Sequence, residues 1–198
     1  MAVSVSLAAN ALFSAEEVYE FVWKAQASRD DEDKDVLLRL GNGVSEAVQR
    51  RLGRAIINEQ CTEYFDGGEE SIYLSNYPVV SITSVTEAGS ALTAPSAQAA
   101  GDGDYDYVAA SGEIYRSSGA FYDGRQQVRV VYTAGLGADS AAIPQDIKTG
   151  ALIWLKMLFD AGPEQYGTTL IEGGSIRPDS IPSQAARLID AYRKLEMW

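Results

Sequence analysis

The sequence predicts an α+β protein, in which a bundle of about four helices carries an inserted antiparallel β meander and a tethered C-terminal helix. Three observations predict this fold class. Apolar residues recur at helical spacing near both ends of the 198-residue chain. In the middle, apolar and polar residues alternate with the period of two that half-buried strands show. Tracts rich in Gly and Pro separate these segments and mark turns or breaks between elements.

The expected boundaries divide the chain into a main domain over residues 1–162 and a tail over 163–198. The main domain holds helices over 14–28 and 30–54, the β meander over 56–135 and a core helix over 144–161. The tail holds a Gly-rich tether and then a last helix from about Pro182 onward.

Helix signals are clearest in the N-terminal part. Ser14 is followed three residues later by Glu17, which together form a capping box. The acidic run Asp30-Asp31-Glu32-Asp33 places negative charge at the start of the second helix, where the macrodipole favours it. Gly41 and Gly43 weaken that helix by about 1 kcal/mol each relative to Ala. They either permit close packing against a neighbour or break the helix.

Strand signals dominate the middle of the chain. Val128, Val130 and Tyr132 alternate with more polar neighbours, which predicts a half-buried strand. The segment Ala88–Gly103 is rich in Ala, Ser and Gly and predicts a long, mobile hairpin loop. Pro144 suits the first turn of the core helix. Because that helix is apolar nearly all round, we expect it to lie at the centre of the fold.

Composition excludes several classes of function. The chain has no histidine, which removes Ser-His-Asp and Cys-His catalysis and His-ligated zinc. Its net charge is −12, and residues 61–135 hold 10 acidic and 3 basic residues. Tight nucleic-acid binding needs Lys and Arg to displace counterions from phosphates, so that class is disfavoured for the middle region.

The cellular compartment expected for the protein follows from its cysteine content and its hydropathy. Cys61 is the single cysteine and cannot form an intramolecular disulfide. No apolar run approaches the roughly 18 residues that a membrane span needs, so no membrane partner is expected. The first residues lack the basic start of a signal peptide. We therefore expect a protein made in the cytoplasm.

One acidic segment has the spacing of a calcium loop. The residues at its positions 1, 3, 5 and 12 are Asp102, Asp104, Asp106 and Glu113. The sixth position is Tyr107, where such a loop needs Gly for its sharp turn. The preferred interpretation is a solvated acidic strand, with no metal and no cofactor. The alternative function is a carboxylate-based glycan-active enzyme or a calcium- or sugar-binding module, because carboxylate pairing is spatial.

The last helix is the strongest functional indication from the residues. It is amphipathic, follows the tether, and ends in residues typical of interfaces, since Met and Trp are enriched there. We predict that it docks on another subunit; folding back on the core of its own chain is the alternative. The predicted interface residues are Leu188, Ile189, Tyr192, Leu195 and Trp198.

An ordered set of short segments over about residues 15–160 carries a family resemblance. The set comprises Asp30-Asp31-Glu32-Asp33 with Leu37 and Leu38, Arg54, Ile72-Tyr73-Leu74, Tyr77-Pro78-Val79-Val80-Ser81-Ile82, the strand ending in Thr133-Ala134-Gly135, and Ile143-Pro144-Gln145-Asp146-Ile147-Lys148. In this order the segments resemble the head–tail connector proteins (adaptor or head-completion proteins) of long-tailed bacteriophages.

This resemblance implies a non-enzymatic structural protein of the virion. Such a protein forms a ring of about a dozen copies at the head–tail junction, beneath the portal protein. The ring continues the DNA channel, lets DNA pass without specific binding, and is a platform for the next neck or tail-completion protein. For this chain it implies that the last helix docks on the portal. The loop Ala88–Gly103 is then expected to project into the channel or toward the tail.

Overall fold

The computed structural model describes residues 5–23, 31–96, 102–161, 169–171, 174–176 and 181–194. The chain forms two compact units, here called the helical unit (Met1–Gly53 with Asp139–Trp198) and the β unit (Arg54–Ala138). This confirms the α+β class. The grouping differs from a 1–162 domain followed by a separate tail, because the C-terminal residues belong with the N-terminal helices.

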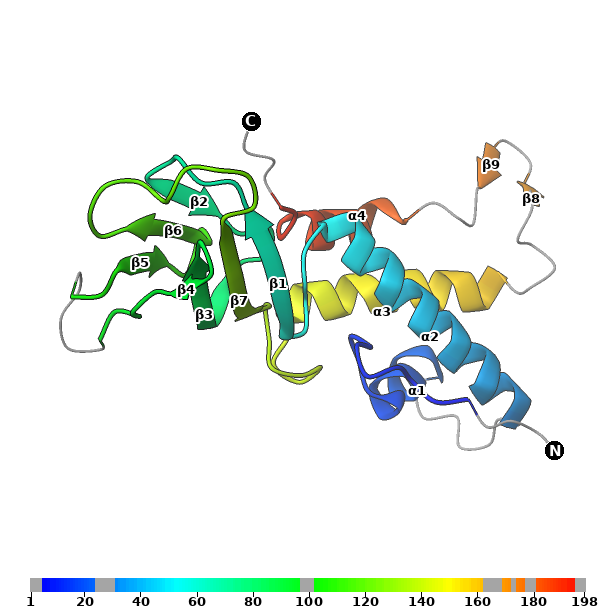
Figure 1. The fold of residues 1–198 in the computed structure, drawn as a ribbon. Coiled ribbons are helices and arrows are strands. Elements are labelled where there is room, and N and C mark those ends of the chain that lie inside the picture. The colour runs from blue at the N-terminus through cyan, green and yellow to red at the C-terminus, as the bar shows by residue number, and fades with distance from the viewer. Residues whose placement is uncertain are drawn as a thin grey trace. The chain divides into compact units, whose positions relative to one another are not determined.

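Among its described residues, the helical unit holds four helices and a short hairpin (Figure 1). They are α1 (Ala15–Trp23), α2 (Asp31–Leu52), α3 (Gln145–Ala161), α4 (Ser183–Asp190) and the antiparallel pair β8 (Thr169–Ile171) and β9 (Gly174–Ile176). The expected helices are thus present. The residues 24–28 that were assigned to the first helix lie outside the described part of the chain.

The start of α1 is fixed by the predicted capping box. The Ser14 N–H donates to Glu17 Oε2 over 2.7 Å, and the Glu17 N–H donates to Ser14 Oγ over 3.2 Å. The other carboxylate oxygen of Glu17 accepts a bond from Lys148 Nζ of α3 at 2.5 Å. The Lys148 side chain is only 6% exposed. The cap of α1 therefore also neutralises a buried ammonium group, which ties α1 to α3.

The two glycines of α2 have different roles. The helix runs unbroken through both, so neither breaks it. A Cβ at Gly41 would lie 3.1 Å from the ring of Phe13, whereas nothing lies within 4 Å of one at Gly43. Beside Gly41, Asn42 Oδ1 accepts the backbone N–H of Ala8 over 2.8 Å. Gly41 thus permits close packing of the N-terminal segment on α2.

A third glycine, Gly150, sets the distance between α3 and α4. A Cβ at this position would lie 2.8 Å from Ile189 Cγ1 and 3.0 Å from the Ala185 carbonyl oxygen. Both Ala185 and Ile189 are fully buried. The backbone of α3 is thus in direct contact with the apolar face of α4. Van der Waals packing of this kind is lost if the helices separate.

The β unit is built from two antiparallel sheets. In the first, β1 (Glu59–Phe65), β7 (Val128–Ala134), β3 (Val79–Glu87) and β4 (Ser90–Ala91) lie in that order, and in the second the order is β2 (Ser71–Tyr73), β6 (Glu113–Arg116) and β5 (Tyr105–Val108). The strand predicted around Val130 is present, but Val131 is buried as well as Val128, Val130 and Tyr132, so the predicted alternation is only partial. The strand order is not that of a simple meander, because β7 lies between β1 and β3. Alternation shows which face of a strand is apolar but not which strand lies beside it.

One apolar core joins the two sheets. Its buried side chains come from both, including Ile72 and Ile114 of the three-stranded sheet and Val130 and Tyr132 of β7. The Tyr132 hydroxyl donates to Glu63 Oε1 over 2.6 Å and accepts the Asn76 N–H over 3.2 Å. Burial, followed by the Glu63 hydrogen bond, raises the pKa of Tyr132. The hydroxyl therefore stays protonated and satisfies two polar groups at the edge of the core.

The close contact at Gly150 leads to a stability prediction. Gly150→Ala forces Ile189 and the α4 backbone to shift, so we expect it to lower the free energy of unfolding by about 1–3 kcal/mol. Urea titration followed by circular dichroism at 222 nm measures the change. The matched control is Gly43→Ala, which meets no neighbour and should raise stability by up to about 1 kcal/mol through helix propensity. Equal effects of the two substitutions would contradict the packing argument.

Candidate partner interface

The predicted docking helix is partly a core element. Ile189, expected at a partner interface, is completely buried against α3 within its own chain. That residue is therefore corrected to a core residue, and folding back, the alternative stated above, describes α4. Leu188 and Tyr192 are half-buried and flank the buried stripe, while Leu195 and Trp198 lie outside the described residues. Amphipathicity showed that α4 had an apolar face, but not that α3 would cover it.

Two polar contacts hold α4 on the end of α2. Arg51 donates through Nε and Nη2 to the two carboxylate oxygens of Asp190, each over 2.7 Å. The Lys194 N–H donates to the Leu52 carbonyl oxygen over 3.0 Å and so satisfies one of the last carbonyl groups of α2. The hydrogen bond from Arg51 lowers the pKa of Asp190. A bidentate pair of this kind fixes direction as well as distance.

The four carboxylates of the calcium register are held apart by separate partners. Asp102 accepts the Ser96 N–H, and Asp104 accepts the Thr93 N–H, each over 2.8 Å. The other two residues lie on strands: Asp106 on β5, and Glu113 on β6. Among the described residues, no three acidic or cysteine side chains come together to hold a metal ion. Asp102 and Asp104 instead pin the described ends of the loop Ala88–Gly103, which lowers their pKa values through these hydrogen bonds.

A groove between α1 and α3 is the described cavity in which the active site of a glycan-active enzyme, the alternative function, would be sought. Its volume is about 590 Å³, and it is lined by Glu17, Glu20, Phe21, Gln145, Leu152 and Lys156. Burial alone would raise the pKa of Glu17, but bonds from Lys148 and Ser14 outweigh it and the pKa is lowered. A glycosidase needs one carboxyl group with a raised pKa as general acid. Glu17 has the opposite property, because it caps α1 and pairs with Lys148.

The outer face of the three-stranded sheet is exposed and aromatic. Pairing in register places its side chains in two rows, Ser71–Tyr115–Asp106 and Tyr73–Glu113–Val108, here called the tyrosine–acid face. Tyr73 is 49% exposed, Val108 43% and Tyr115 37%. The Tyr73 hydroxyl donates to Glu113 Oε1 over 3.2 Å, and Tyr115 lies directly across from Asp106 in the strand register. The opposite face of these strands carries Ile72 and Ile114 into the core.

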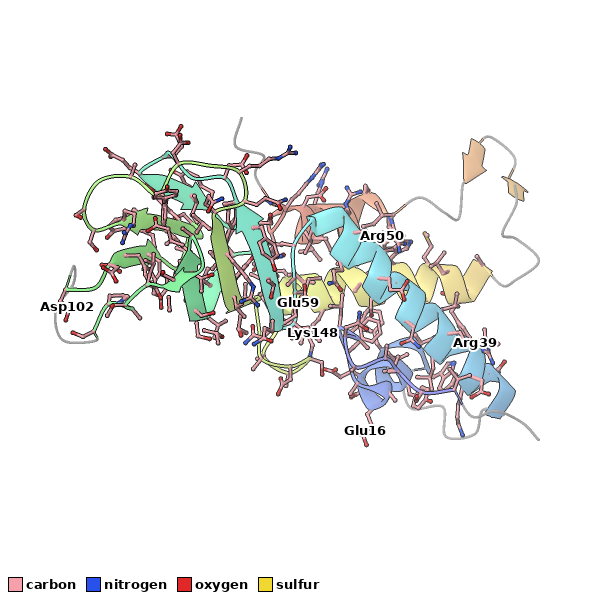
Figure 2. The ribbon with its side chains drawn as sticks, in the orientation of Figure 1. Glu16, Arg39, Arg50, Glu59, Asp102 and Lys148 are labelled. Atoms are coloured by element: carbon pink, nitrogen blue, oxygen red, sulfur yellow. The ribbon has the colours of Figure 1, made fainter. Side chains whose placement is uncertain are left out.

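The C-terminal ends of α2 and α4, which the Arg51–Asp190 pair joins, carry exposed basic side chains. These are Arg50 in the last turn of α2, Arg187 in the last turn of α4 and Arg193 just after α4, here called the arginine patch; of the three, Arg193 acts electrostatically on Asp190. Arg50 projects from the C-terminal end of α2 (Figure 2). The linear sequence pattern did not identify the tyrosine–acid face. Strand register, which that pattern does not contain, brings its members together.

Comparison with known proteins indicates the family to which the chain belongs. A model of the head completion protein family matches residues 11–195. No curated protein sequence matches the chain. Similar solved structures include a chain from the neck of an empty gene transfer agent (GTA) particle computed with C6 symmetry. That chain has a TM-score of 0.65 and 17% identity, and the match covers 98% of this chain and 95% of the other.

Two further solved structures have the same fold. A chain from the virion of a native GTA particle gives a TM-score of 0.64 at 16% identity, covering 98% of this chain and 95% of that one. A chain from the neck of a native GTA particle computed with C12 symmetry gives 0.60 at 18% identity, covering 100% and 97%. At these identities the likeness shows a shared fold.

The tyrosine–acid face and the exposed arginines lie on open surfaces of a small α+β protein, where they are accessible to other macromolecules. The family match gives the particular class. Because the family model spans nearly the whole sequence, this chain belongs to the head completion protein family. The expected family resemblance is thereby confirmed. None of the helices that the structure describes has the length and hydropathy required to cross a bilayer.

The Arg51–Asp190 pair leads to a pH prediction. A carboxyl group whose pKa is lowered by folding stabilises the protein above its unfolded pKa, about 4, and loses that contribution as pH falls through the lowered value. We expect Asp190→Asn to be less stable than wild type at pH 7 but equally stable near pH 2. Urea titrations across this range measure the difference. Arg51→Ala should show the same pattern, and an unchanged difference from pH 7 to pH 2 would contradict the assignment.

Proposed function

We propose that this chain is a non-enzymatic structural protein of the neck of a phage-like particle, where copies form a ring between portal and tail. The observation that carries the proposal is the family match over residues 11–195. The solved structures of similar fold support it, since two come from GTA necks computed with C6 and C12 symmetry. A ring of about a dozen copies is consistent with such symmetry. The protein is made in the host cytoplasm and becomes part of the head–tail junction of the virion.

The negative charge of the β unit supports the proposal that this unit lines a channel through which DNA slides. Residues Arg54–Ala138 hold 11 acidic and 4 basic residues, a net charge of −7. A surface of this sign repels phosphates and does not release their counterions, so DNA passes without being bound. The loop Ala88–Gly103 is proposed to project into this channel or toward the tail. The ring is also the platform for the next neck or tail-completion protein.

The C-terminal residues are proposed to dock on the portal protein. Leu188 and Tyr192 are half-buried in the helical unit and leave part of their surface open. Leu195 and Trp198 follow directly in the sequence and complete the proposed apolar contact. Ile189 contributes indirectly, because its burial against Gly150 holds α4 in place.

The ring itself is tested by imaging. Electron microscopy of purified particles that contain this chain should show a closed ring of its copies between portal and tail. Particles from cells that lack the gene should have filled heads without attached tails. Finding the chain in another part of the particle, or attached tails without it, would refute the proposal.

Portal docking is tested with surface substitutions that spare the core. Leu188→Ser with Tyr192→Ser removes two large apolar contacts, so we expect binding to purified portal rings to weaken at least tenfold, or more than about 1.4 kcal/mol. Sedimentation of mixtures measures the affinity. The matched control is Tyr64→Ser with Tyr122→Ser, which removes two exposed tyrosines of the β unit. Equal affinities of the test and control variants would contradict docking through α4.

A further inference from the structure

The tyrosine–acid face has the chemistry of a receptor for arginine. Its exposed rings at Tyr73 and Tyr115 can each take a guanidinium group on their face. Asp106 Oδ1 already accepts the Tyr107 N–H, and Glu113 Oε1 accepts the Tyr73 hydroxyl. An ionised carboxylate has about four acceptor sites, so each of the two can also accept a guanidinium N–H. The Tyr73 hydroxyl is bonded to Glu113, and Tyr115 is paired in register with Asp106, so each ring lies beside a negative charge. Rigid aromatic residues cost little entropy when a partner binds. The face therefore fits a partner that presents several arginines together.

The same chain carries such a group of arginines. In the arginine patch, Arg50 is 72% exposed and its contact with Glu46 is an open 3.7 Å pair, which holds the side chain only weakly. Asp190, on which Arg193 acts electrostatically, already accepts hydrogen bonds from Arg51 on both carboxylate oxygens. Arg187 lies two residues before the buried Ile189 and so points away from the core of the helical unit. The patch thus presents positive charge in a protein of net charge −12.

From this complementarity we propose that neighbouring copies join by docking the arginine patch of one copy on the tyrosine–acid face of the next. The proposal rests on the ring described under the proposed function and assigns its lateral contact. Two different surfaces of one chain meet, so the contact is head-to-tail and can close into a ring. Each copy supplies both halves in equal number. If the tyrosine–acid faces of two copies met each other, carboxylates would lie opposite carboxylates and repel.

Charge reversal tests the contact in the full-length protein. One variant, Asp106→Lys with Glu113→Lys, makes the face basic; the other, Arg50→Glu with Arg187→Glu and Arg193→Glu, makes the patch acidic. Each variant alone opposes like charges, and we expect its self-association to be at least about tenfold weaker than that of wild type. An equimolar mixture restores opposite charges at both kinds of contact, and should assemble into rings in which the variants alternate. Sedimentation velocity and native mass spectrometry at low salt measure assembly and composition.

Matched controls reverse the same number of charges elsewhere. Glu69→Lys with Glu70→Lys controls for the face variant, and Arg39→Glu with Arg125→Glu and Arg129→Glu controls for the patch variant, since all five side chains are exposed. Circular dichroism verifies that every variant is folded. The controls should assemble like wild type. Salt should weaken wild-type assembly, because exposed charges are screened.

Four results would overturn the proposal. If both variants assemble alone like wild type, the ring stands but its contact lies elsewhere. If the mixture fails while the controls assemble, the two surfaces do not meet. If wild type binds duplex DNA and the patch variant does not, with assembly unchanged, the patch contacts phosphates. If wild type never associates and particle necks contain no ring of this chain, the proposed function fails together with this contact.

Discussion

The close approach of α3 and α4 at Gly150 is the constraint on which the helical unit depends. Because Gly150 has no side chain, Ile189 and the backbone of Ala185 come into direct contact with α3. The C-terminal helix consequently becomes part of the core and is held on α2 by Arg51 and Lys194. The C-terminal helix, which the sequence predicted to be tethered, is thus packed on α2 and α3 for most of its described length. Of the described apolar residues on α4 and just after it, Leu188 and Tyr192 stay only half-buried, so the docking proposed for this part of the chain is limited to the flanks of its apolar stripe.

Glu17, the partner of the buried Lys148, serves several structural purposes at once. Glu17 accepts the Ser14 N–H, caps α1 and neutralises Lys148 of α3. An unpaired ammonium group in this position would be costly, since burial removes its hydration. The groove beside it therefore contains a carboxylate already committed to structure. The acidic residues Asp102 and Asp104 are likewise engaged with the backbone of a loop. In the described part of the chain these carboxylates are elements of the scaffold, which agrees with a protein that works by contact.

The distribution of exposed side chains suits assembly. The tyrosine–acid face and the arginine patch are small, opposite in charge and located on different units of one chain. Surfaces of this kind give specificity and register more than raw affinity, because exposed ion pairs contribute little individually. A ring multiplies each weak contact by the number of copies and closes without free ends.

The sequence by itself determined the local elements. The capping box at Ser14 and Glu17, the strand around Val130 and the helix that follows Pro144 all appear as expected, because each depends on residues a few positions apart. Tertiary structure decided the rest. Only packing placed β7 between β1 and β3, buried Ile189, and gathered Tyr73, Glu113 and Tyr115 on one face. The physical reason is that periodicity shows which face of an element is apolar or charged, whereas the partner that covers it is chosen by contacts between residues far apart in the chain.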